Sequence, residues 1–485
     1  MTEGLKEKTI SGMLWSSVGK FGTMGLQFIS NMVLARLLMP SDYGVIGMLH
    51  VFIAVSSIFV SAGFGSALIQ KKNPTHIDYT SVFYWNLVAS ILFYGILFFC
   101  GPAIARFYNM KELCVVLRVQ SLSLIIQAFS TVQSSQLQKQ LRFRELSIRN
   151  IIATLIGTII AIVMAFFGYG VWSLVASSLV SSTAGVFLLW WMSSWRPTWE
   201  FSWQSLKELF SFGGLMALSS FVETIYSNIQ GLIIGKLFSA SDLGYYNQAK
   251  KLEEVPTTAL SQIVNQVTFP VFSSLQDDKT KLLVGVRKNI QAVTYLNFPL
   301  MAVLVLIAKP LIILLYGIKW EVSVPYFQIL CIAGLIYTTN TLNTNVIKSL
   351  GKSNIYFFTQ LLKRLIGILL IIGGVRWGIK GLLWGITIYC YVSFVINSIV
   401  NYRLIKYGLW QQIKDVSDNL LISALSVVVA YIVNYLKMPI YIEMVVQIIV
   451  FCLCFYILSR LFKCQGLSIM MEIIKSYKNK NKKKL

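Results

Sequence analysis

The stretch SVFYWNLVASILFYGILFFC, residues 81–100, carries no charged side chain. A helix rises about 1.5 Å per residue, so this stretch has the length that a helix needs to cross about 30 Å of hydrocarbon. A second stretch, NIIATLIGTIIAIVMAFFGYG at 150–170, has the same property. The chain of 485 residues is 56% hydrophobic and 13% charged, whereas an average soluble domain is about a quarter charged. The composition therefore predicts an all-α integral membrane protein.

Apolar segments of membrane-spanning length recur along the whole chain. We count about fourteen, with ends defined to within a few residues. They lie near 11–35, 44–69, 79–100, 113–137, 147–167, 170–195, 208–235, 244–273, 290–315, 322–347, 355–373, 379–402, 418–436 and 440–463. About fourteen transmembrane helices are therefore expected.

The net charge of +23 is distributed unevenly between the connections. Most of the 42 Lys and Arg residues lie in the N-terminal stretch, in every second connection and in the C-terminal tail. Because Lys and Arg favour the cytoplasmic side, both termini are expected in the cytoplasm. Basic residues in short loops do not form the continuous face that nucleic acid requires, so nucleic acid is not an expected partner.

The tail KSYKNKNKKKL at 475–485 is the most basic stretch. Such a run can bind the headgroups of anionic membrane lipids. An unstructured tail that fixes topology would have the same composition. The sequence leaves both alternatives open.

Two octapeptides, LLMPSDYG at 37–44 and LFSASDLG at 237–244, are nearly the same. Each follows a predicted helix and precedes another, and six spans separate them. An even number of spans gives the two copies the same orientation, as in a parallel repeat. In each copy Ser-Asp can cap the next helix, so the octapeptide is interpreted as a helix corner without a substrate role.

A second pair of similar stretches, GYGVWSLVASSLV at 168–180 and GIKGLLWGITIYC at 378–390, has a similar offset. The repeat predicts two pseudo-symmetric six-helix bundles followed by two extra C-terminal helices. The expected domains are an N-terminal bundle at 1–203, a C-terminal bundle at 204–403, an extra helix pair at 404–463 and a basic cytoplasmic tail at 464–485.

Four further stretches carry a family resemblance: GFGSALIQKKN (63–73), FGYGVWSLVASSLVS (167–181), YNQAKKLEEVPTTALSQIVNQVTFPVFSSLQDDKTKL (246–282) and LLYGIKWEVSVPYFQIL (314–330). In this order they resemble the oligosaccharide flippases of the multidrug/oligosaccharidyl-lipid/polysaccharide exporter superfamily. The nearest branch is that of the Wzx-type, colanic and teichuronic acid exporters. The resemblance implies a two-lobed transporter that moves a polyprenyl-pyrophosphate-linked oligosaccharide from the cytoplasmic to the outer leaflet.

The same resemblance implies its partners, which are the lipid-linked oligosaccharide, membrane lipids, and the polysaccharide polymerase and glycosyltransferases of the pathway. The sequence has no GxxxxGK[ST] phosphate loop and no cysteine or histidine spacing typical of a metal site. No catalytic residue, metal or cofactor is therefore expected, and the chain is predicted not to be an enzyme.

Charged residues inside the predicted spans are the candidate substrate-binding groups, because an intramembrane charge that faces lipid is costly. The candidates for binding pyrophosphate are Lys20, Lys363, Arg364, Lys250 and Lys251. Each has a structural alternative. Adjacent residues on a helix project about 100° apart, so one of Lys363 and Arg364 can snorkel or hold a carbonyl, and Lys250 and Lys251 can pair with Glu253 and Glu254.

Glu223 is the candidate for ion coupling, since it lies in a predicted span that carries no other charge between Glu208 and Lys236. It could take up a proton or Na⁺, or pair with a basic residue of the cavity. Two other functions remain open. The first alternative is a cation-coupled drug or metabolite exporter of the same superfamily, for which acidic cavity residues should dominate. The second is a membrane polysaccharide polymerase, which the short outer loops disfavour.

Overall fold

The computed structural model describes residues 3–436 and 438–482, which form α-helices, three short 3-10 segments and no strands. The first nine helices are α1 (Glu3–Leu37), α2 (Pro40–Ser61), α3 (Phe64–Gln70), α4 (His76–Phe107), α5 (Leu113–Gln120), α6 (Leu122–Lys139), α7 (Phe143–Phe166), α8 (Val171–Met192) and α9 (Trp203–Leu237). The others are α10 (Ala240–Ser274), α11 (Lys279–Leu306), α12 (Ala308–Tyr316), α13 (Ser323–Ser349), α14 (Ser353–Gly374), α15 (Gly378–Ile405), α16 (Leu409–Tyr431), α17 (Ile440–Leu461) and α18 (Gln465–Lys482). The predicted all-α class is confirmed.

The described helices include ten candidate spans that are long and apolar enough to cross a membrane. One of them, Ser353–Ile405, covers two of the predicted segments. Helices α1, α10 and α13 also have membrane-spanning length but are not among these ten. The chain is therefore a multi-pass membrane protein, and the count of fourteen spans stays a prediction.

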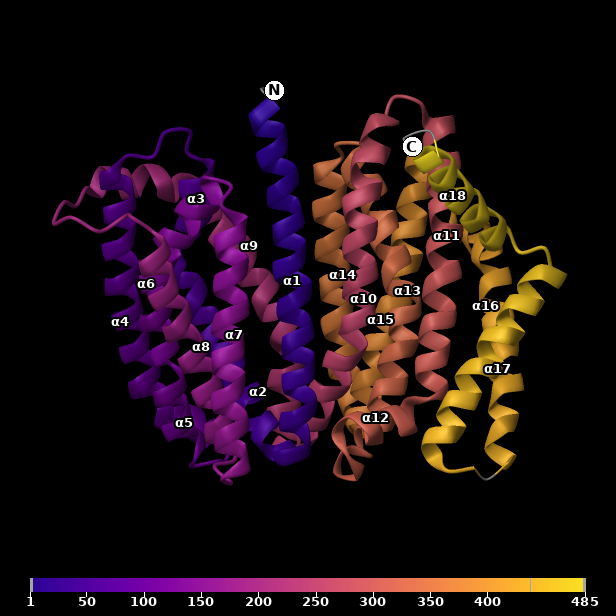
Figure 1. The fold of residues 1–485 in the computed structure, drawn as a ribbon, viewed down its shortest axis with the longest axis horizontal. Coiled ribbons are helices and arrows are strands. Elements are labelled where there is room, and N and C mark those ends of the chain that lie inside the picture. The colour runs from indigo at the N-terminus through magenta and orange to yellow at the C-terminus, as the bar shows by residue number, and fades with distance from the viewer. Residues whose placement is uncertain (1–2, 437, 483–485) are drawn as a thin grey trace. The chain divides into compact units, whose positions relative to one another are not determined.

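The chain divides into two compact units, with unit 1 ending at Asn247 and unit 2 beginning at Gln248. Within each unit the long helices run side by side (Figure 1). Unit 1 thus contains α9 and the first residues of α10 as well as α1–α8. The boundary at 203/204 is predicted from the sequence repeat and not from contacts between helices, and it stays a prediction.

Some predicted helix ends differ from the structure. The segment predicted at 44–69 is interrupted between α2 and α3, where Ala62 and Gly63 have φ angles of 43° and 72°. A Cβ on Gly63 would lie 2.0 Å from the carbonyl oxygen of Gly213 in α9, so the close approach of that helix requires glycine here. The segment predicted to begin at 290 begins at Lys279, because the Asp278 side chain caps α11 by accepting the N–H groups of Thr280 and Lys281.

The two octapeptides of the sequence repeat meet inside unit 1. Helices α2 and α10 begin at equivalent positions, and Asp42 and Asp242 each accept the backbone N–H three residues earlier, at 2.8 and 3.2 Å. A Cβ on Gly44 would lie 1.7 Å from the carbonyl oxygen of Ala240, and one on Gly244 would lie 1.9 Å from that of Pro40. The contacts are reciprocal, as expected for two copies of a repeat related by a pseudo-two-fold axis.

Buried amide side chains join the helices of unit 2. Asn343 of α13 donates to Gln412 of α16 at 2.8 Å and accepts from Asn401 of α15 at 2.8 Å. At the start of α16, the carboxylate of Asp415 accepts hydrogen bonds from Nε and Nη2 of Arg287, at 2.8 and 2.7 Å. Between helices that lipid surrounds, such polar contacts stabilise packing because lipid provides little hydrophobic driving force.

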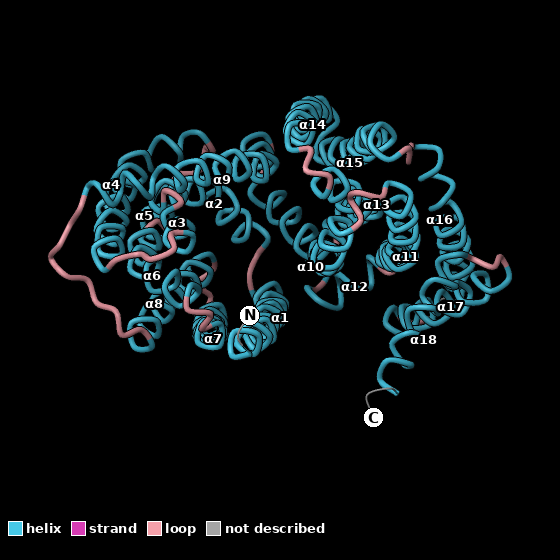
Figure 2. Tube along the Cα trace, turned by 90° about the horizontal axis from the view of Figure 1, so that it is seen from above, coloured by secondary structure: helices cyan, strands magenta, loops and turns pink. Residues whose placement is uncertain are grey.

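The C-terminal region of unit 2 forms three helices next to α11, as Figure 2 shows when the structure is seen from above. Helices α16 and α17 occupy the predicted extra pair at 404–463. Residues 465–482 of the predicted tail form α18 rather than an unstructured segment, and residues 483–485 lie outside the described part. Gln465 accepts a hydrogen bond from Gln291 at 2.6 Å, and Cys464 donates to Asn419 at 3.0 Å, which attaches the start of α18 to α11 and α16.

Replacing Gly44 or Gly244 by alanine should disrupt the crossing of α2 and α10. The added methyl group would overlap backbone atoms that cannot rotate away. We therefore expect the free energy of unfolding to fall by about 1–3 kcal/mol or more, the usual cost of overpacking. Thermal unfolding and size-exclusion profiles in detergent measure this effect. The matched control is Gly25→Ala in α1, where a Cβ meets no atom within 4 Å. Equal stability of all three variants would contradict the close crossing.

Candidate functional site

Unit 1 contains a polar cavity of about 420 Å³ between α1, α6 and α7, which we call the α1 chamber. Its charged lining residues are Lys20 of α1 and Arg149 of α7. Hydroxyl and amide side chains surround them, from Ser16, Thr23, Ser134, Gln138, Ser147 and Asn150. Met24, Phe143 and Leu146 add apolar lining, so the chamber combines two cations with hydrogen-bonding and apolar groups and contains no lining carboxylate.

A second polar cavity, the α8 chamber, has a volume of about 330 Å³ and lies between α6, α7 and α8. Its lining residues are Gln127, Ser130, Thr131, Arg149, Asn150, Ala153, Thr154, Ser181 and Ser182. Arg149 and Asn150 line both chambers. The two cavities are therefore adjacent, with the Arg149 side chain at their common wall.

Small residues bring α1 close to α7, and Lys20 of α1 and Arg149 of α7 line the cavity beside this contact. A Cβ on Gly19 would lie 2.3 Å from Oγ of Ser147, and this hydroxyl donates to the carbonyl oxygen of Trp15 at 2.7 Å. Membrane helices approach closely where small residues face each other and where a hydroxyl bonds across the contact. The contact of Gly19 with Ser147 therefore sets the short separation of α1 and α7 at the wall of the α1 chamber.

The Arg149 guanidinium is held by neutral groups. Its Nε donates to the carbonyl oxygen of Gly185 at 3.2 Å, and its Nη1 donates to Oδ1 of Asn150 at 2.8 Å. A Cβ at position 185 would lie 2.7 Å from Nη2, so a glycine leaves room for the arginine. Within the described residues, neither Lys20 nor Arg149 forms an ion pair with a carboxylate. Both cations are thus available to an anionic ligand.

Arg149 is not among the sequence-based candidates, because it closely follows the basic connection that precedes the span predicted at 147–167. Arg142 and Arg144 come shortly before it and share that cytoplasmic signal. Its position two residues inside the predicted span was the available clue. Pairing with Lys20 depends on tertiary packing, so the sequence alone could not reveal it.

Lys363 lies in the interior of unit 2, where it is 4% exposed. Its Nζ donates to Oδ1 of Asn397 in α15 at 3.2 Å, and Asn397 donates to Asn340 of α13 at 3.0 Å. This bond uses one of the three N–H groups of the ammonium, so the burial of Lys363, rather than the bond to Asn397, limits the access of a ligand oxygen. Arg364, the next residue of α14, is half-buried. A role for these two residues in binding pyrophosphate remains a prediction.

Lys250 and Lys251 lie on α10 in unit 2. The predicted local pairing is present for Lys250, whose Nζ lies 3.8 Å from Oε1 of Glu254. Glu253, in contrast, is 9% exposed and accepts from the Thr257 hydroxyl at 2.5 Å. The ion pair favours the structural interpretation of Lys250, and a contact of either lysine with substrate remains a prediction.

Glu223, the candidate for ion coupling, lies on α9 in unit 1 and is exposed. It does not line the α1 chamber or the α8 chamber. The structure places Lys20 in unit 1 and Lys250, Lys251, Lys363 and Arg364 in unit 2, so the expected basic set is shared between the two units.

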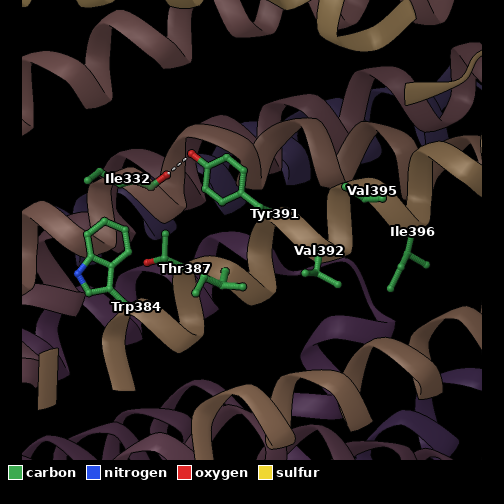
Figure 3. A pocket seen from close by; sticks show the side chains of 8 residues that line it. Ile332, Trp384, Thr387, Tyr391, Val392, Val395 and Ile396 are labelled. Carbon is green, nitrogen blue, oxygen red and sulfur yellow. Dashed lines mark hydrogen bonds between the residues drawn. The ribbon is translucent and has the colours of Figure 1, made fainter. Parts of the chain in front are cut away.

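Unit 2 also has a groove of about 490 Å³ on α13 and α15 (Figure 3). Trp384, Ile388, Val392, Val395 and Ile396 line it, together with Tyr391, whose hydroxyl donates to the carbonyl oxygen of Ile332 at 3.1 Å. No lining residue is charged. The groove is therefore chemically unsuited to an anionic headgroup, in contrast to the chambers of unit 1.

Comparisons with known proteins agree with this membrane architecture. The chain is 26% identical to the lipopolysaccharide biosynthesis protein WzxC of Escherichia coli (strain K12), over 82% of this chain and 81% of that protein. It is 24% identical to the teichuronic acid biosynthesis protein TuaB of Bacillus subtilis (strain 168), over 88% and 89% of the two chains. The fold is similar to that of the lipid II flippase MurJ in an inward closed conformation, with a TM-score of 0.76, 15% identity, and coverage of 93% and 98%.

The family described as polysaccharide biosynthesis protein matches residues 33–325. This region contains α2–α12 and most of the unit 1 residues that form the two polar chambers. It also contains both octapeptides of the repeat. The chain belongs to the polysaccharide biosynthesis protein family.

Proposed function

We propose that the chain is a flippase that moves a polyprenyl-pyrophosphate-linked oligosaccharide from the cytoplasmic to the outer leaflet of a bacterial inner membrane. It belongs to a polysaccharide biosynthesis family, and its relatives include proteins named for lipopolysaccharide and teichuronic acid biosynthesis. Its fold is similar to that of a lipid II flippase. The product would enter lipopolysaccharide, capsule or exopolysaccharide, and the protein would act as a transporter rather than an enzyme.

The α1 chamber is the observation that carries this proposal. A pyrophosphate diester carries about two negative charges at neutral pH, and moving it with its sugars through hydrocarbon without compensating contacts is prohibitively costly. Lys20 and Arg149 supply two cations next to hydroxyl and amide groups in a cavity without a lining carboxylate. A guanidinium binds phosphate oxygens through paired N–H groups, and an ammonium adds a compact charge. The polyprenyl chain would stay in lipid.

The basic residues of unit 2 would form a second set of contacts in an alternating-access cycle. The pyrophosphate would bind to Lys363, Arg364, Lys250 and Lys251. Separately, Glu223 of unit 1 would take up a proton or Na⁺ and so couple transport to an ion gradient. Both termini would lie in the cytoplasm, as the distribution of Lys and Arg predicts. Membrane lipids, a polysaccharide polymerase and glycosyltransferases would be its partners.

The alternative function is a cation-coupled exporter of drugs or metabolites. A cavity for cationic drugs should have carboxylates to balance the charge of its ligand. The α1 and α8 chambers have lysine, arginine and neutral polar groups in their linings instead. Their charge therefore favours an anionic substrate.

Deleting the gene should cause the lipid-linked oligosaccharide to accumulate on the cytoplasmic face of the inner membrane. The measurement is mass spectrometry of extracted lipids after treatment of inside-out vesicles with an enzyme that modifies only exposed sugars. A plasmid copy should clear the accumulated lipid. If the deletion strain, freed of redundant transporters, shows no accumulation, the flippase function is contradicted and the small-molecule exporter becomes the better explanation.

Replacing Arg149 by alanine should reduce this clearance by about tenfold or more, because a hydrogen bond to a charged group contributes roughly 1.5–3 kcal/mol. Lys20→Ala should have a similar effect. Arg118→Ala is the charge-matched control, since Arg118 of α5 lies outside both chambers and donates to the carbonyl oxygen of Phe98 at 3.2 Å. Protein levels in the membrane must be equal. Wild-type clearance by both chamber variants would remove the α1 chamber from the transport path.

A further inference from the structure

The α8 chamber has the lining of a site for an uncharged polyhydroxyl ligand. Arg149 is its only charged lining residue, and most of the others carry a hydroxyl or an amide. These groups come from three helices, with Gln127 on α6, Thr154 on α7 and the pair Ser181 and Ser182 on α8. Hydroxyls and amides both donate and accept, which matches the mixed hydrogen-bonding capacity of sugar hydroxyls.

Several of these groups have unused hydrogen-bonding capacity. In the part of the chain that the structure describes, the side chains of Gln127, Thr154, Ser181 and Ser182 form no hydrogen bond with protein groups. They are exposed or half-buried, so a ligand can reach them. Ser130, in contrast, donates to the carbonyl oxygen of Gln127 at 2.8 Å and keeps only its acceptor lone pairs.

Arg149 connects this chamber with the α1 chamber. Its Nε and Nη1 are engaged by Gly185 and Asn150, whereas Nη2 has no hydrogen-bond acceptor within the described residues. Lys20 lines only the α1 chamber. Lys20 thus adds a second cation on one side of the Arg149 side chain, whereas the lining residues on the other side are uncharged.

We propose that the α8 chamber binds the sugar directly attached to the pyrophosphate, while the α1 chamber binds the pyrophosphate itself. This assignment rests on the proposed function and adds to it a division of the substrate between two subsites. Nη2 of Arg149 binds a phosphate oxygen at the junction, and Gln127, Thr154, Ser181 and Ser182 bind sugar hydroxyls. A site that hydrogen-bonds substrate hydroxyls discriminates against ligands that lack them, so these four residues select the first sugar.

The test uses the full chain in nanodiscs and two ligands. One is the lipid-linked oligosaccharide extracted from a strain that lacks the chain, and the other is polyprenyl pyrophosphate without sugar. The variant Ser181→Ala/Ser182→Ala/Thr154→Val removes three hydroxyls with little change of shape. We expect it to bind the oligosaccharide about tenfold or more weakly, from the loss of several hydrogen bonds, and to bind the sugar-free lipid as the wild type does.

Two control variants make the result specific. Thr183→Val removes a hydroxyl that lies on α8 but outside the chamber, where Thr183 donates to the carbonyl oxygen of Leu179 at 2.8 Å. This variant should bind both ligands as the wild type does. Lys20→Ala should weaken both ligands equally. The sugar assignment is overturned if the triple variant binds the oligosaccharide normally, or loses both ligands to the same extent. A wild-type chain that binds neither ligand would instead overturn the proposed function.

Discussion

The crossing of α2 and α10 at Gly44 and Gly244 is the constraint on which the arrangement of unit 1 depends. Each glycine lies against the backbone of the other copy, at Ala240 and at Pro40, with no space for a methyl group. Because both octapeptides take part, the two copies of the sequence repeat contact each other directly. The contact fixes where α2 and α10 begin, and α9, which leads into α10, packs against α2, α3 and α4.

A second close approach, between α1 and α7, produces the candidate site. Gly19 and Ser147 let the two helices touch, and this contact brings the ammonium of Lys20 and the guanidinium of Arg149 to one polar cavity. The same arginine reaches a cavity lined by hydroxyls and amides on α6 and α8. Two glycines, at positions 19 and 185, thus provide the space for the charged wall that an anionic, sugar-bearing lipid requires.

Much of this architecture could be predicted from the sequence. Apolar length predicts the spans, and the octapeptides predict the corners between α1 and α2 and between α9 and α10, because capping and hydropathy act locally. The break at Ala62 and Gly63 was missed because it depends on the approach of Gly213 from α9. The partnership of Lys20 with Arg149 and the burial of Lys363 against Asn397 were missed for the same reason. Such contacts join residues far apart in the chain, so no local sequence pattern predicts them.

The most direct test of this account is photocrosslinking of the purified chain in nanodiscs. The probe is a polyprenyl-pyrophosphate-linked sugar that carries a diazirine on the sugar next to the pyrophosphate, and mass spectrometry locates the adducts. The account predicts adducts on peptides of α1, α6, α7 and α8, with loss of labelling in the Arg149→Ala variant. Adducts confined to unit 2, for example on the α14 peptide that contains Lys363, would contradict the assignment of the substrate headgroup to the chambers of unit 1.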